Sequence, residues 1–246
     1  MKGRTLAILG AVLFLVFLVA LIPARVAIGW VAPPNVVLNG VTGTIWSGSA
    51  AQLGVNGKLV GRLRWSDGSW LTLIGRPSWQ VELDRSDGFL RGHVGATMGG
   101  SLRARDLEGA TSLPALKGLA PVGNSEGDIS IRLDEIAVDV GLLERISGRV
   151  VIDRLRPPGL REGDLGTLLV SFPGDDEAPL TGLIEIEGGP ITVVDGRIVL
   201  QPDGSYEIGG RIAATEDAPR DISQAMQFMG SPDADGYREF SLAGSP

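Results

Sequence analysis

The sequence predicts a mainly β protein: an antiparallel meander, curled sheet or sandwich that follows a single N-terminal transmembrane helix and includes one or two short helices. Three observations carry this fold class. The chain holds 36 glycines among 246 residues, about twice the usual share of roughly 7%. These glycines separate short runs in which apolar and polar residues alternate, as in half-buried strands. Residues 6–22 form one long apolar run without charge, and no later stretch resembles it.

The apolar run at residues 6–22 would be about 25 Å long as a helix, near the short end of what crosses a bilayer core. Lys2 and Arg4 precede it, and such basic residues stay in the cytoplasm. We therefore expect residues 1–30 to form a cytoplasmic stub and a membrane anchor. A cleaved signal peptide is the alternative, but the length of the run and Arg25 in the candidate cleavage stretch argue against it.

Composition excludes several classes of function. Without cysteine the chain has neither disulfides nor thiol chemistry, so apolar burial and backbone pairing must hold the fold. The net charge of −7 and the lack of a basic cluster beyond the amino end argue against nucleic acid as a partner. Apolar residues make up 43% of the chain, which is enough to offset the entropy of ordering and argues against disorder.

Strand-like runs begin soon after the anchor. Residues 36–38 and 41–46 are rich in β-branched and aromatic residues, and Asn39-Gly40 between them predicts a type I′ hairpin turn. Residues 47–49 are expected to end this piece. Further alternating strands, with a turn at residues 86–88, are expected at residues 59–65, 79–84 and 89–94.

Residues 127–133 place three apolar side chains on one face, but the alternation slips by one residue at Asp134. Because residues 136–140 continue in the new phase, a β-bulge or a reversal is required at that point. Asp195-Gly196 predicts one of the later hairpin turns. The remaining strands are expected at residues 148–153, 168–172, 183–187, 191–194, 197–200 and 205–212.

Two helices are predicted, and both would cover an end or a face of a sheet. Residues 219–229 carry apolar side chains at helical spacing with Pro219 in the first turn, and residues 112–119 form a shorter candidate. Gly-Arg begins alternating runs four times, which indicates two related halves, about residues 36–112 and 125–246. The alternative is that Gly-Arg simply begins hairpin strands in a β-rich chain.

The chemistry of an enzyme is missing from the sequence. His93 is the sole histidine and no Gly-x-Ser-x-Gly motif accompanies it, so we expect an ordinary strand residue. Asp175-Asp176-Glu177 lacks the spacing of a dedicated calcium loop, and a solvated turn is expected there. We therefore predict no catalytic, cofactor-binding or metal-binding residues, no cofactor and no enzymatic activity.

Several motifs, taken in order, resemble a known family. Residues 40–50, Gly-Val-Thr-Gly-Thr-Ile-Trp-Ser-Gly-Ser-Ala, are similar to the Gly-x-x-Gly-Thr-aliphatic-Trp-Ser-Gly-x-Ala stretch that follows the anchor in protein N of the type II (general) secretion pathway. Residues 61–65 resemble the segment that comes next in that family. Four segments near the end resemble the closing hairpins and the final helix exit of that family: residues 188–191, 200–206, 209–212 and 229–233.

The resemblance implies a single-pass protein of the cell inner membrane with a cytoplasmic N-terminus and a periplasmic β-rich domain at residues 31–246. Such a protein would be an accessory or scaffold component that assists export of folded periplasmic proteins across the outer membrane, with other type II secretion subunits as partners. The resemblance implies no catalytic residues. The alternative is a lipid-handling β-groove protein of the envelope-assembly (AsmA-like) type, whose apolar concave face would hold acyl chains.

Overall fold

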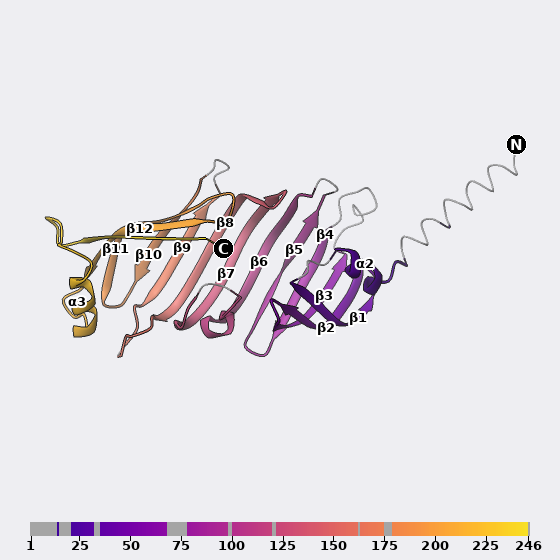
Figure 1. The fold of residues 1–246 in the computed structure, drawn as a ribbon, viewed down its shortest axis with the longest axis horizontal. Helices are drawn as coiled ribbons and strands as arrows, with labels where there is room; N and C mark the ends of the chain where they lie inside the picture. The colour runs from indigo at the N-terminus through magenta and orange to yellow at the C-terminus, as the bar shows by residue number, and fades with distance from the viewer. Residues whose placement is uncertain are drawn as a thin grey trace, which may run out of the picture. The chain divides into compact units, whose positions relative to one another are not determined.

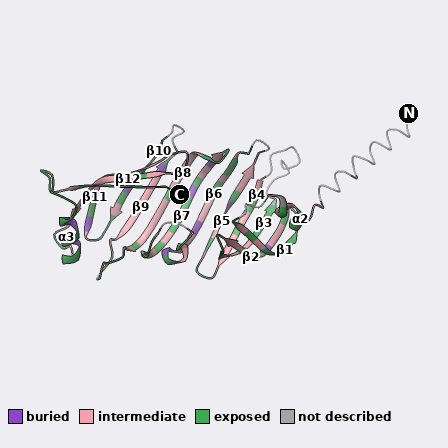
Figure 2. Ribbon diagram, in the orientation of Figure 1, coloured by how far each residue is buried: buried purple, intermediate pink, exposed green. Residues whose placement is uncertain are grey.

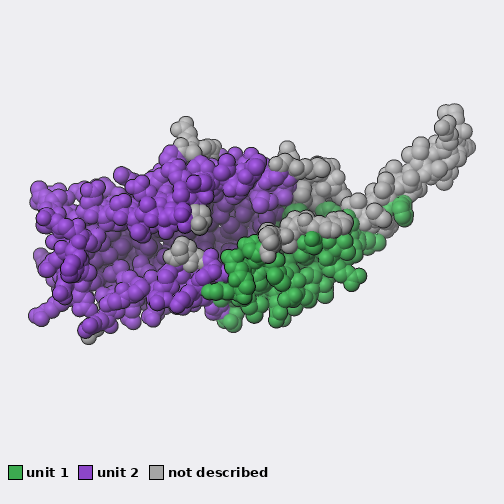
Figure 3. Space-filling model, in the orientation of Figure 1, with its two compact units in different colours: residues 1–86 green, residues 87–246 purple. Residues whose placement is uncertain are grey.

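The computed structural model describes residues 14, 21–31, 35–67, 78–97, 100–119, 122–161, 163–174 and 179–245. These residues form thirteen strands, two α-helices and one short 3-10 helix, so the prediction of a mainly β, antiparallel fold is confirmed. The chain divides into two compact units, Met1–Ser86 and Asp87–Pro246 (Figure 3).

The first unit is an antiparallel meander that follows a short helix (Figure 1). Each of its strands pairs with the next one along the chain. Its described elements are α2 (Ala24–Val31), β1 (Val36–Gly43), β2 (Ser47–Val55), β3 (Lys58–Asp67) and β4 (Ser78–Arg85).

None of the described helices combines the length and the apolar character that a membrane crossing requires. The anchor expected at residues 6–22 lies outside the described residues, apart from Phe14, Leu21 and Ile22. The predicted transmembrane helix therefore stays a prediction.

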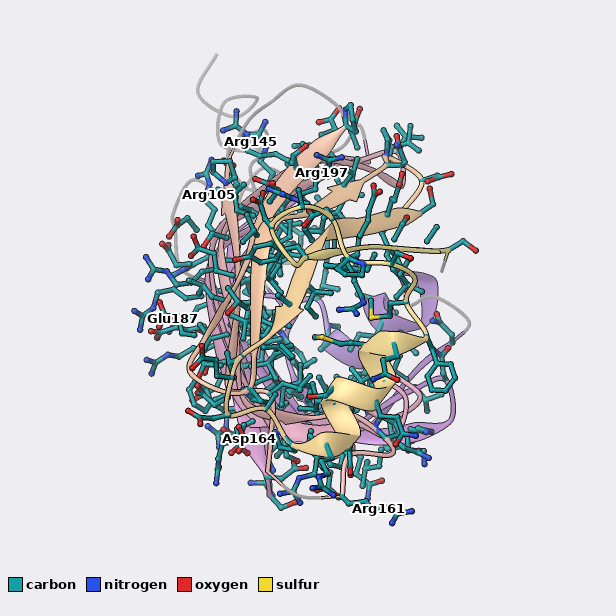
Figure 4. All side chains as sticks on the ribbon, turned by 90° about the vertical axis from the view of Figure 1, so that its left-hand side faces the viewer. Arg105, Arg145, Arg161, Asp164, Glu187 and Arg197 are labelled. Carbon is teal, nitrogen blue, oxygen red and sulfur yellow. The ribbon has the colours of Figure 1, made fainter. Side chains whose placement is uncertain are left out.

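The second unit is itself an antiparallel meander in chain order, from β5 to β13. Figure 1 shows its last strands passing in front of the central ones, and the end view in Figure 4 shows the sheet bent into a trough with a helix at its open side. Its elements are β5 (Gly88–Ala96), β6 (Leu102–Ser112), η2 (Leu113–Leu116), β7 (Glu126–Asp139), β8 (Leu142–Arg156), β9 (Thr167–Pro173), β10 (Leu180–Glu187), β11 (Ile191–Leu200), β12 (Tyr206–Ala214), α3 (Arg220–Gln227) and β13 (Arg238–Gly244).

Two predicted hairpin turns are wrong, because both dipeptides lie inside strands. Asn39-Gly40 falls within β1 and Asp195-Gly196 within β11. Gly40 and Asp195 have φ angles of 65° and 54°, the left-handed backbone that a type I′ turn also needs. The first reversal instead lies at residues 44–46, and Ser47 begins β2 rather than ending a strand.

The predicted phase slip at Asp134 is confirmed as a β-bulge in β7. Leu133 lies opposite Gly148 of β8, whereas Glu135 lies opposite Ser147, so Asp134 is the extra residue. The neighbouring strand β6 makes a matching adjustment against β5, and its Asp106 has a φ of 51°. The two strands thus change phase together, and their apolar residues stay on one face.

Three strands were not predicted from the sequence: β2, β6 and β13. The predicted helices are present as α3 and the shorter η2. Ile222 and Met226 of α3 are buried against Ile191 of β11, and Leu113 of η2 is 2% exposed. Both helices therefore cover part of the sheet, as expected.

Two tryptophans hold the first reversal of unit 1. The indole Nε1 of Trp65 donates a hydrogen bond to the Thr44 carbonyl at 3.1 Å, and that of Trp79 donates to the Ile45 carbonyl at 2.9 Å. The ring of Trp65 covers Gly48, where an added Cβ would lie 2.6 Å from its Cζ2 atom and closer still to the Thr42 carbonyl oxygen of β1. The Thr-Ile-Trp-Ser-Gly motif is therefore a packing motif in which glycine leaves room for an aromatic ring.

We predict that Gly48→Ala destabilises the protein by about 1–3 kcal/mol, because the methyl group overpacks the contacts with the Thr42 carbonyl oxygen and the Trp65 ring. Gly54→Ala is the matched control in the same strand, since the nearest atom to its added Cβ is 3.6 Å away. Thermal unfolding of the full chain in detergent measures both variants. Equal melting temperatures for the two would contradict the packing role of Gly48.

Candidate functional site

The two faces of unit 2 differ in chemistry. Residues directly opposite each other in an antiparallel pair lie on the same face, so the register joins side chains into rows across the strands. We call the inner face the one that carries Ile131, Val150 and Val170. One inner row crosses six strands from β6 to β11 and consists of Gly109, Ile131, Val150, Val170, Ile184 and Gly196. A second row consists of Thr111, Ile129, Ile152, Leu168 and Ile186.

The inner face is only partly covered. Ile131, Val150 and Val170 lie on central strands, yet each is half-buried. Figure 2 shows much of the central strands in the colour of intermediate burial. Such side chains would be fully buried in a closed sandwich, where a second sheet packs against the first. Among the described residues, α3 covers the inner face at β11, and Ile191 is 6% exposed there. The inner face is therefore an apolar surface with room for more contacts.

Glycines make the inner face smooth. An added Cβ at Gly182 would lie 2.7 Å from the ring of Phe172, and one at Gly210 would lie 3.2 Å from the ring of Phe240. Both aromatic rings therefore lie against a neighbouring strand where it has no side chain. This arrangement leaves the trough free of protruding rings at these positions.

The outer face carries ion pairs. Glu108 of β6 lies between Arg91 at 2.6 Å and Arg132 at 3.0 Å, and hydrogen bonds from these guanidinium groups hold the pKa of Glu108 below its usual value. Glu135 of β7 faces a second set of arginines, Arg103, Arg105 and Arg145, at 3.4–3.9 Å. Figure 4 shows Arg105, Arg145 and Glu187 on this convex side. The outer face is thus a solvated, charge-paired surface.

The residues considered for chemistry do not come together. His93 lies in β5, as expected, and its half-exposed ring has Nδ1 at 3.6 Å from Asp106. Asp175-Asp176-Glu177 lies outside the described residues. Within the part of the chain that the structure describes, no group of three His, Asp or Glu side chains could hold a metal ion.

The inner rows are the feature that sequence reasoning missed. Each strand showed its own alternation, but the pattern of one strand does not say which residues of the next strand lie beside it. The available signal was the repeated i, i+2 spacing of aliphatic residues, as in Ile129, Ile131 and Leu133. Joined through the register, these short patterns make one continuous apolar surface.

Comparisons with known proteins identify the family. A family model described as "Type II secretion system (T2SS), protein N" matches residues 34–241. Three relatives carry the name "Type II secretion system protein N". The one from Aeromonas hydrophila is 28% identical over 96% of each chain. The one from Vibrio cholerae is 23% identical over 91% of this chain and 90% of its own. The one from Pectobacterium carotovorum subsp. carotovorum is 22% identical over 99% of each chain.

No solved structure matches the chain. The family match nevertheless spans most of the residues and includes both compact units. The resemblance drawn from the motifs is therefore confirmed, and the chain belongs to the family of protein N of the type II secretion system.

Proposed function

We propose that this chain is an accessory or scaffold component of type II secretion that assists export of folded periplasmic proteins across the outer membrane. Membership of the protein N family supports a role in protein transport alongside other subunits of the system. In this proposal residues 6–22 hold the chain in the inner membrane, residues 1–4 stay cytoplasmic and residues 31–246 lie in the periplasm. Lys2 and Arg4 support this orientation.

The observation that carries the scaffold role is the attachment of the segment after the apolar run to the first hairpin. The Ile45 amide donates a hydrogen bond to the Ile22 carbonyl at 3.1 Å, and Pro23 forms an isolated bridge with Thr44. Ala24, at the start of α2, is 1% exposed. Because these contacts fix residues 22–24 against the first hairpin, an anchor ending at residue 22 would keep the sheet of unit 1 close to the membrane surface.

Orientation is tested with fused reporters. A reporter that is active only in the periplasm should be active after Pro246 and inactive after Arg4, because the basic amino end stays in the cytoplasm. Enzymatic assay of whole cells measures both fusions. The reverse pattern would overturn the proposed localisation.

The scaffold role predicts that the anchor matters as well as the sheet. Deleting the gene should retain secreted enzymes in the periplasm, with partial retention for an accessory subunit. The full chain should restore secretion, whereas residues 31–246 exported behind a cleavable signal peptide should restore it poorly, because they are no longer confined to the membrane. Enzyme activity in the medium and in the periplasm is the measurement. Full rescue by the unanchored form would argue against a scaffold.

A lipid-handling groove is the second candidate, and the partly exposed inner face of unit 2 favours it. Its side chains are aliphatic, and its strand backbones already pair with their neighbours. An extended peptide placed there would find no free backbone partners, whereas an acyl chain needs none.

We predict that a photo-crosslinking residue at position 131, on the inner face, captures lipid in cells if the groove is used. The same residue at position 130 is the matched control, since Ser130 is exposed on the opposite face of the same strand. Mass spectrometry of the purified chain detects the adduct. Equal labelling at both positions, or none at position 131, would count against the groove.

A further inference from the structure

The last strand of unit 2 has a free edge. β13 pairs with β12 along all seven of its residues, from Arg238 opposite Ile212 to Gly244 opposite Tyr206, and this register is unbroken. On its other side no strand pairs with it among the described residues. The backbone groups along that side are therefore available to another strand.

This edge has few of the features that usually prevent pairing. Sheet edges are commonly protected by charged side chains, proline, a bulge or a very short strand. The sequence of β13, Arg-Glu-Phe-Ser-Leu-Ala-Gly, carries charges only at its first two residues, contains no proline or lysine, and has no register shift. Leu242 is an apolar residue on this edge strand, and it is 59% exposed. The edge strand keeps a regular register, is partly apolar and is open to addition of another strand.

We propose that β13 pairs in antiparallel fashion with β13 of a second copy of this chain, around a twofold axis at Ser241. This register is the one in which all seven residues find a partner. Phe240 then lies opposite Leu242 of the second copy, and both side chains belong to the inner face because they follow Gly210 and Ile208 of β12. The apolar residues of the strand are thus complementary to themselves.

Charge supports the same register. Arg238 lies opposite Gly244 of the second copy, and Glu239 lies opposite Ala243 of the second copy, so no like charges meet. Moving the axis to Glu239 would place the two Glu239 carboxylates directly opposite each other, which is unfavourable. Moving it by one residue to Phe240 leaves Ala243 and Gly244 without partners in β13 of the second copy. Complementarity and length therefore select the axis at Ser241.

The dimer would extend the inner face. A twofold axis perpendicular to the sheet keeps the inner faces of both copies on the same side. The row of Gly182, Ile198, Ile208 and Leu242 would then continue into the second copy through its Phe240. This inference does not depend on whether the trough binds lipid or protein.

The cysteine-free sequence makes a sharp test possible. In Ser241→Cys the two introduced thiols would lie directly opposite each other, about 4.5–5.5 Å apart between Cβ atoms, close enough for a disulfide after small adjustments. The full chain in native membranes should give a product of twice the chain mass under mild oxidation. Ser130→Cys, exposed on the outer face of β7, is the control and should remain at the mass of one chain.

A second pair of variants tests whether the strand itself mediates the contact. Leu242→Lys places a charge opposite Phe240 of the second copy and should reduce the Ser241→Cys dimer several-fold. Leu183→Lys is the matched control, because Leu183 is 56% exposed but lies on the central strand β10. A Ser241→Cys chain that stays single although its thiol reacts with maleimide would overturn the proposal. Crosslinking to a different protein, or equal dimer yields from the two lysine variants, would overturn it as well.

Discussion

The fold of unit 2 depends on keeping the apolar side chains of every strand on one face. A single extra residue sends all later side chains of a strand to the opposite face unless a β-bulge absorbs it. Asp106 of β6 lies beside Asp134 of β7. At this level β6 shifts its register against β5, and β7 shifts its register against β8. Gly148 of β8, with a φ of 122°, accommodates the close approach of the β7 backbone. The inner rows continue on both sides of this level because the adjustments coincide.

The sequence predicted strands best where alternation is uninterrupted, as in β4 and β12. It failed where a left-handed residue lies inside a strand, because the chemistry that favours a tight turn also favours a bulge. For this reason the sequence predicted two strands and a turn in place of each of β1 and β11, which contain Asn39-Gly40 and Asp195-Gly196. Strand β6 was missed because Asp106 breaks its pattern and charged residues occupy much of its outer face. The choice between turn and bulge is made by the neighbouring strands, which a local pattern does not contain.

The candidate site was less accessible to sequence reasoning than the fold. Composition alone argued against catalysis, and the polar and apolar sides of single strands such as β4 could be assigned correctly. The rows of the inner face could not be assigned from the sequence, since they depend on the register of five or six strands at once. The exposure of these rows could not be predicted from the sequence either. It depends on how far the sheet curls and on how little of the sheet α3 and η2 cover. Both properties are set by contacts between residues distant in the sequence.

The contrast between the faces bears on how the chain is stabilised. Exposed ion pairs such as Arg91 with Glu108 are screened by water and contribute little to stability, so the outer face adds little beyond solubility. The inner face holds most of the aliphatic side chains of the central strands, but the half-exposed ones obtain only part of the free energy that full burial would give. Anything that covers this face in the folded chain and not in the unfolded chain shifts the folding equilibrium toward the native state. A subunit built this way is more stable when its apolar face is occupied than when it stands alone, as expected for a protein whose family works within a larger secretion system.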